Sequence, residues 1–258
     1  MGRYDASGFE GSMIKAVISD SIINYGPTKG IVAGTTLKGI NYAIHSSKSQ
    51  SFIKEAIAQR DKLVNELGFY DLITLKQIHS GRIYVINNEN KRKFLDCNVK
   101  GDGLLTDMKN TLIGVLTADC IPLFYFDMDG SFVGIAHAGW RGIKKRIHQR
   151  MLDIIFRNYG IKARDVIVVI GPHICNCCYE VQKDMYGKVD KDFIQERDSR
   201  LYLGLEDIVI RDLMNSGIQG VNINRYSFCT YCSENPSFYS YRKGDIEERM
   251  LSFIGRKD

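Results

Sequence analysis

The stretch LIGVLTADCIPLFYFDMDGSFVGIAHAGWRG, residues 112–142, decides the fold. It contains three short runs rich in apolar, β-branched and aromatic residues: Leu112 to Ala118, Leu123 to Phe126 and Phe132 to Ala136. Runs of this length and composition are typical of buried strands. Asp129-Gly130 separates the last two runs and is typical of a hairpin turn. The stretch therefore predicts strands in a buried sheet.

Helical periodicity appears on both sides of this stretch. Apolar residues recur at helical spacing in Ser51 to Leu67, Ile143 to Tyr159 and Leu205 to Met214, and a glycine follows each segment within a few residues. Further strands are predicted at Lys15 to Ile23, Leu72 to Lys76, Arg82 to Asn87 and Val166 to Ile170. Because strands and helices mix without strict alternation, we expect an α/β (α+β) fold, a single domain with mixed β-sheets flanked by helices.

The chain ends and the overall charge set further expectations. Residues 1–12 (MGRYDASGFEGS) lack periodicity, so we expect an added leader, with Met13 as the native start of a domain over 13–258. Among the 258 residues, with a net charge of +5, no basic block exceeds three residues and no apolar run approaches the ~20 residues of a membrane helix. We therefore expect a cytoplasmic protein with no dedicated nucleic-acid partner and no membrane span.

Three residues of metal-binding type stand at the ends of predicted strands. His79 follows the strand that begins at Leu72, Cys120 follows the strand from Leu112, and His137 follows the strand from Phe132. Loops at strand ends present functional side chains on a rigid scaffold. Two His and one Cys can hold a catalytic zinc ion and leave a fourth position open for water or substrate. The three residues could thus share one zinc site, with copper the less favoured metal, although their spacing alone favours the alternative of a turn histidine, a core thiol and a loop cap.

The same residues also fit a metal-free site. Cys120 would be a nucleophile, His137 its base, and Asp119 an orienting or relaying group. The two hypotheses make opposite predictions about bound metal.

The remaining cysteines offer a second metal hypothesis. Seven cysteines, an odd number, favour free thiols, metal ligands or a nucleophile over a disulfide framework. Two C-x-x-C pairs, Cys175 with Cys178 and Cys229 with Cys232, could supply four thiolates to a structural zinc ion. The pairs are far apart in the sequence and Cys177 is an extra thiol, so small buried residues in tight turns are the favoured interpretation.

Candidate anion-binding residues lie near these motifs. Phe238 to Lys243 combines aromatic rings with two cations, which could stack a base and bind phosphate. Arg141 follows the His137 motif and is a second candidate. Asp102, between two glycines, is a weaker candidate for the pocket, and we expect His173 to be a loop histidine that faces solvent.

Six motifs together resemble the YfiH-like proteins, in the same order and over nearly the whole chain from Ile14. This family was long labelled multicopper polyphenol oxidoreductase, or laccase domain, and is now described as purine nucleoside phosphorylase with accompanying adenosine deaminase activity. The motifs are KQIHSG (76–81), GDGLLT (101–106), TADCIPL (117–123), AHAGWRG (136–142), IGPHICNCCYEV (170–181) and FYSYRK (238–243).

The resemblance implies a single α/β domain, zinc as the cofactor, and a purine nucleoside and phosphate as partners. Zinc would be held by His79, Cys120 and His137. The stretch Gly30 to Thr36 departs from the family, because it lacks the arginine that members carry near a phosphate pocket. A distant similarity to a Cys–His hydrolase keeps the hydrolase alternative open. A purine-binding module without enzymatic activity is a further alternative. Five histidines argue against multicopper laccase chemistry, the older family label.

Within that hypothesis each remaining candidate has a role. The catalytic residues would be Asp119, Cys120 and His137, with Asp119 as the proton carrier in deamination. The contacts to substrate or phosphate would come from Arg141, Tyr241 and Arg242.

Overall fold

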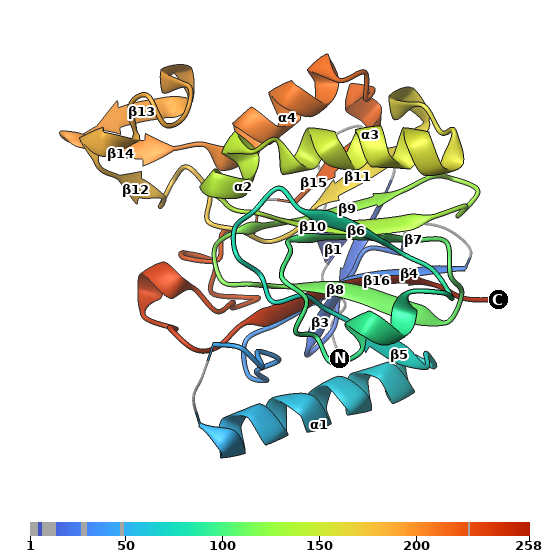
Figure 1. Cartoon of the computed structure of the whole chain (residues 1–258). Helices are drawn as coiled ribbons and strands as arrows, with labels where there is room; N and C mark the ends of the chain where they lie inside the picture. Colours follow the sequence, from blue (N-terminus) through green and yellow to red (C-terminus); the bar gives the residue numbers. More distant parts are fainter. Residues whose placement is uncertain (1–4, 7–13, 27–29, 47–48, 227) are drawn as a thin grey trace.

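The computed structural model describes residues 5–6, 14–26, 30–46, 49–226 and 228–258. Two large sheets lie face to face, with helices on both outer sides (Figure 1). The layers run from α3 and α4, through the two sheets, to α1. The expected single domain with mixed sheets and flanking helices is confirmed.

The first sheet has seven strands, of which all but one neighbouring pair are antiparallel. Helix α1 (Gln50–Glu66) covers its outer face, and Leu63 and Val64 of this helix pack against the sheet. The strand order is β1 (Asp5–Ala6), β2 (Ala16–Ile18), β3 (Ile22–Asn24), β4 (Ile31–Thr36), β16 (Met250–Arg256), β8 (Thr111–Thr117) and β5 (Asp71–Ile73).

The second sheet has six strands and lies between the first sheet and two helices, α3 (Ile147–Tyr159) and α4 (Leu205–Asn215). Its four inner strands are completely buried, whereas its two edge strands are only partly buried. The strand order is β15 (Ile223–Arg225), β11 (Ile167–Ile170), β9 (Ile121–Phe126), β10 (Val133–Ala138), β7 (Gly103–Thr106) and β6 (Ile83–Ile86).

Strand β9 shows why the central runs are continuously apolar rather than alternating. Leu123 and Tyr125 point to the core beneath the helices, whereas Phe124 and Phe126 point to the core between the two sheets. Because side chains alternate along a strand, a strand covered on both faces needs apolar residues at every position. All four side chains are fully buried.

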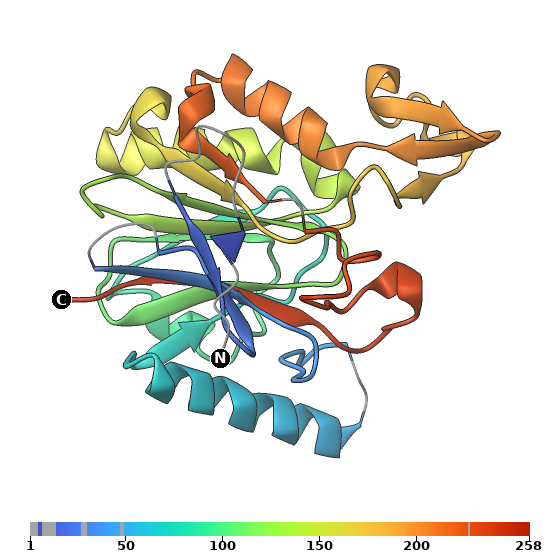
Figure 2. The same ribbon diagram turned by 180° about the vertical axis from the view of Figure 1, so that it is seen from behind.

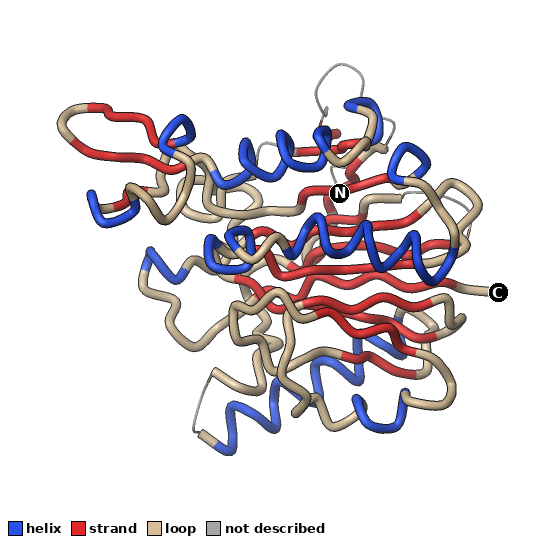
Figure 3. Tube along the Cα trace, turned by 45° about the horizontal axis from the view of Figure 1, so that its top comes forward, coloured by secondary structure: helices blue, strands red, loops and turns tan. Residues whose placement is uncertain are grey.

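A third, small sheet projects from one side of the molecule (Figures 1 and 3). Its strand order is β12 (Glu180–Val181), β14 (Arg200–Leu203) and β13 (Ile194–Arg197). Seen from behind, this sheet and the segment before β16 lie at the same side (Figure 2). Short 3-10 turns complete the chain at Lys91–Phe94, Ala163–Asp165, Lys183–Met185, Lys191–Phe193, Gly220–Asn222 and Tyr241–Lys243.

Two predicted elements differ from the structure. The single helix predicted over Ile143 to Tyr159 is wrong, since α2 (Trp140–Lys144) ends before Arg146, whose φ of 60° is left-handed and interrupts the helix before α3. The single strand predicted from Lys15 to Ile23 is a hairpin of β2 and β3, closed by a hydrogen bond from Ser19 N to Ile22 O (2.9 Å).

The other helices and strands appear within a few residues of their predicted bounds. The predicted leader lies outside the described residues, apart from Asp5 and Ala6 in β1. In the described part of the chain, no helix combines the length and the hydropathy that a membrane span requires.

Candidate active site

A cavity of about 580 Å³ opens where the ends of several strands meet. This volume lies in the range of small-molecule sites. The connection after β5 supplies His79, the β8–β9 connection supplies Asp119 and Cys120, and the end of β10 supplies His137. The structure thus places the candidate residues from three distant segments around one cavity.

The candidate metal ligands His79, Cys120 and His137 form a compact group. Their ligand atoms all lie within 4.8 Å of one another, and His79 Nε2 is 3.9 Å from Cys120 Sγ. The sequence allows this approach because residue 139 is glycine: a Cβ there would be 2.7 Å from Cys120 Sγ. Gly139 is therefore needed for the close contact between the β10 end and the thiol.

Asp102 holds the two histidines of this group in position. Its fully buried carboxylate accepts hydrogen bonds from His137 Nδ1 (2.9 Å) and from the backbone N–H groups of His79 (2.9 Å) and Ser80 (2.6 Å). His137 is fixed so that Nε2 faces Cys120, and the left-handed turn at His79 (φ 55°) is held in place. Asp102 was the weaker candidate in the sequence, although its position between two glycines at the start of β7 marked a close backbone approach.

Charges within the group shift three pKa values. Burial alone would lower the pKa of His137, but Cys120 and Asp102 outweigh burial and raise it to about 9. Burial alone would raise the pKa of Cys120, but the two histidines lower it to about 6. The pKa of Asp102 falls to about 2, because the bonds from His137 and Ser80 outweigh its burial. The Cys120 thiolate, the form that binds metal, is thus favoured at neutral pH.

The donor set fits a zinc ion. Two imidazoles and one thiolate are zinc ligands, and a histidine whose other ring nitrogen is held by a carboxylate is the usual arrangement around zinc. Three ligands facing a cavity would leave a coordination position for a substrate atom. Without metal, the same Cys120–His137 contact is the geometry of a thiolate–imidazolium pair, so the hydrolase alternative is geometrically possible.

Asp119 connects this group to two other segments. Its backbone has a φ of 90°, and its carboxylate accepts hydrogen bonds from Thr230 Oγ1 (2.7 Å) and from the backbone N–H of Arg242 (2.8 Å). The Asp119 carbonyl accepts from Ile174 N (3.0 Å). Each carboxylate oxygen of Asp119 accepts one hydrogen bond and keeps a second lone pair, so the carboxylate can connect these segments and still carry a proton.

Three arginines line the cavity. Arg141 stacks on Trp140 at 4.4 Å, and Arg242 lies 5.0 Å over the Tyr179 ring and bonds to Glu180 O (2.8 Å). Tyr241 is more than half exposed at the opening. Among the described residues that line the cavity, Asp119 is the one acidic side chain, so the three arginines give this lining a charge that suits an anion.

The third arginine, Arg249, was missed in the sequence. It donates to the backbone carbonyls of Ile246 (3.0 Å) and Glu248 (2.6 Å), and burial lowers its pKa. A sequence signal existed, because Arg249 directly precedes the apolar run of β16. Met250 of β16 pairs with Thr117 of β8, which places Arg249 beside the β8–β9 connection that carries Cys120.

Two other predictions from the sequence concern residues that do not line the cavity. Gly30 to Thr36 lies largely in β4, inside the first sheet, and does not line the cavity. The expectation that His173 faces solvent is wrong: the ring is 1% exposed, bonds to Gly171 O (2.9 Å) and lies near Glu206. Four further cysteines gather in a separate group outside the cavity.

Comparisons with known proteins identify the family and the fold of the chain. A family model described as multi-copper polyphenol oxidoreductase laccase matches residues 28–257. A purine nucleoside phosphorylase of Clostridium acetobutylicum is 29% identical over 95% of this chain and 99% of its own length. A protein named adenosine deaminase RL5, from an unknown prokaryotic organism, is 29% identical over 90% of this chain and 93% of its own. The crystal structure of a Bacillus licheniformis protein named YfiH superposes with a TM-score of 0.84 at 29% identity, over 93% of this chain and 97% of that one.

Proposed function

This chain belongs to the multi-copper polyphenol oxidoreductase laccase family, and within it we propose a zinc-dependent purine nucleoside phosphorylase with adenosine deaminase side activity. Of two relatives that align over more than nine-tenths of their length, one is named a purine nucleoside phosphorylase and the other an adenosine deaminase. The substrates would be adenosine, inosine or methylthioadenosine, together with phosphate.

One observation carries the proposal: a cavity of about 580 Å³ combines a His–Cys–His group with three arginines and aromatic rings. A nucleoside needs stacking surfaces for its base, and phosphate needs cations. Tyr241 and Trp140 offer rings, and Arg141, Arg242 and Arg249 offer guanidinium groups that can bind phosphate oxygens in pairs.

His79, Cys120 and His137 would hold the zinc ion. Bound there, zinc would supply Lewis acidity toward an atom of the purine ring. In phosphorolysis the phosphate oxygen attacks the anomeric carbon as the bond to the purine nitrogen breaks, so positive charge gathers on the ribose and negative charge on the leaving base. The arginines would hold phosphate against that carbon, and Asp119 would carry the proton required in deamination.

The alternatives are weaker on the same observations. Oxidation by several copper ions needs many histidine ligands, and the two candidate metal groups among the described residues contain only His79 and His137 between them. A Cys120–His137 hydrolase would work without metal, so a chelator would leave its activity intact and a thiol alkylator would abolish it. The proposal predicts loss with both reagents.

The test is product analysis. The purified, zinc-loaded protein is incubated with adenosine and with inosine, with and without phosphate, and the products are separated by chromatography. The proposal predicts free base and ribose 1-phosphate only when phosphate is present, and some inosine from adenosine. A zinc-loaded protein that releases neither base nor inosine would refute it.

A further inference from the structure

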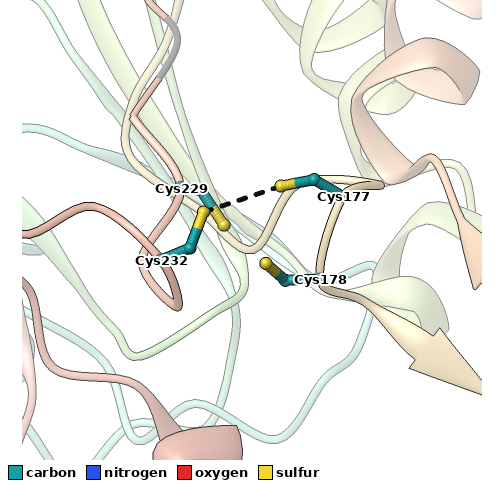
Figure 4. A group of neighbouring side chains, drawn as sticks. All are labelled: Cys177, Cys178, Cys229 and Cys232. Carbon is teal, nitrogen blue, oxygen red and sulfur yellow. Dashed lines mark hydrogen bonds between the residues drawn. The ribbon is translucent and has the colours of Figure 1, made fainter.

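A second group of four thiols lies apart from the cavity. Cys177 and Cys178 come from the connection between β11 and β12, and Cys229 and Cys232 come from the segment after β15 (Figure 4). Their four sulfur atoms all lie within 4.8 Å of one another, and all seven cysteines of the chain are free thiols. The sulfurs point toward a common space between the two segments.

The spacing of the sulfurs matches a metal centre better than a disulfide. Cys177 Sγ and Cys232 Sγ are 3.8 Å apart. A tetrahedral zinc centre with Zn–S bonds of about 2.3 Å has its sulfurs about 3.8 Å from one another. A disulfide would need about 2.05 Å.

The structure changes one member of the group expected from the sequence. Cys175 was paired with Cys178 by the C-x-x-C pattern, but Cys177 occupies that position instead. The Cys175 thiol points to the carbonyl of His173 (3.8 Å), and its backbone N–H donates to Cys229 Sγ (3.4 Å). Cys175 thus supports a ligand through its backbone rather than acting as one.

Cys229 is the most buried of the four cysteines. It is 4% exposed, and the backbone N–H groups of Tyr231 and Cys232 also favour its thiolate and lower its pKa. Several N–H donors on one sulfur stabilise a thiolate, which is the form that binds metal. Cys177 and Cys232 are exposed, so a metal ion can enter from solvent without opening the fold.

We propose that Cys177, Cys178, Cys229 and Cys232 bind a second zinc ion in a closed, four-thiolate structural site. Four sulfur ligands fill a tetrahedral shell and leave no position for substrate. The two segments that this ion joins also line the cavity, one through Ile174 and Tyr179, the other through Tyr241 and Arg242. Thr230, next to Cys229, donates a hydrogen bond to Asp119, so the ion would help to hold this cavity-lining residue in place.

Metal content separates this site from the His–Cys–His group. The full chain is purified from zinc-supplemented cells with a reductant and no chelator, and zinc per chain is measured by mass spectrometry. We expect about two zinc ions in the wild type and in Cys175→Ser, and about one in Cys120→Ala and in the double variant Cys177→Ser/Cys232→Ser. Cys175→Ser is the matched control, because it removes a thiol from the same turn.

Cobalt gives a second measurement that does not depend on the double variant. Cys120→Ala keeps no cysteine in the first group, so cobalt added to its metal-free form should show strong sulfur-to-cobalt absorption and the intense visible bands of tetrahedral coordination. Wild-type zinc content in Cys177→Ser/Cys232→Ser would overturn the proposal. So would weak, octahedral-type cobalt bands, or iron in place of zinc in the purified protein.

Discussion

The two thiol-containing groups differ in their surroundings. His79, Cys120 and His137 face a cavity and rest on a buried carboxylate, whereas the four cysteines face one another between two loops. Mixed ligands with a free side suit a reacting metal, and a complete thiolate shell suits a structural one. Position in the fold thus separates the proposed site for chemistry from the proposed site for stability, although cysteine is common to both.

The largest expected effect is that of Cys120→Ala. Loss of one of three ligands should remove the metal from this group and lower kcat/KM for inosine phosphorolysis by about 10³-fold or more, since Lewis acid catalysis contributes several kcal/mol. The metal of the four-cysteine group should remain. A metal-free Cys120→Ala protein with full activity would contradict the assignment.

Asp102→Asn tests the support of the first group. An amide in place of the carboxylate removes the charge that faces His137 and forces one donor against the N–H groups of His79 and Ser80. We expect metal affinity or kcat/KM to fall by about 10 to 100-fold, as for other residues that position metal ligands. Titration with a zinc indicator gives the affinity. Asp129→Asn, an exposed turn residue, is the control and should match the wild type.

Asp119→Asn separates proton transfer from metal binding. The asparagine can keep the hydrogen bond from Arg242 N–H to its amide oxygen and can donate its amide N–H to Thr230 Oγ1, but it cannot carry a proton. Deamination of adenosine should slow by about 10²-fold, the scale of general acid–base catalysis, with zinc content unchanged. Equal loss of zinc and of deamination would show that Asp119 only holds the loops.

The double variant Cys177→Ser/Cys232→Ser should have a smaller effect on chemistry than on stability. Loss of about 1–2 kcal/mol would lower Tm by roughly 2–8 °C, at about 2–4 °C per kcal/mol for a domain of this size. We expect kcat/KM to change only a few-fold, through looser placement of Tyr241 and Arg242. Calorimetry of this variant beside Cys175→Ser decides the point, and an equal Tm for both would argue against a structural ion.

The smallest effect concerns pH and involves neither group. His148 on α3 is fully buried against Asp212. Burial lowers the pKa of His148 below 6.5, the nearby Arg146 and Arg211 lower it further, and the contact with Asp212 offsets these effects only in part. The unfolded chain therefore binds a proton that the folded chain does not, so stability is full above pH 6.5 and falls as pH drops below it, by at most about 1.4 kcal/mol per pH unit for one proton.

The variant His148→Gln tests the predicted direction of this change in stability with pH. Glutamine can keep a bond to Asp212 without titrating, so its unfolding free energy should fall less than that of the wild type between pH 7.5 and pH 5.5. Urea unfolding of metal-free protein at both pH values measures this, because both metal groups also lose metal in acid. Identical slopes for the two proteins would show that His148 does not titrate in this range.

The sequence could predict most of the fold and the His–Cys–His group, for a shared reason. Continuous apolar runs identify the buried strands, and His79, Cys120 and His137 follow strand ends, where the sheet itself determines position. The four-cysteine group lies in loops, and C-x-x-C spacing selects Cys175, whereas the loop brings the sulfur of Cys177 to the other three. Arg249 precedes the apolar run of β16, but its place at the cavity depends on the pairing of β16 with β8, a long-range contact that this local pattern does not predict.

The most direct test of the account compares free base released from inosine, in the presence of phosphate, by Cys120→Ala and by Cys177→Ser/Cys232→Ser. The account predicts no phosphate-dependent release from the first variant and near wild-type release from the second, because only the first group faces the cavity. Release that survives in Cys120→Ala but is abolished in a folded Cys177→Ser/Cys232→Ser protein would contradict this division between a catalytic and a structural site.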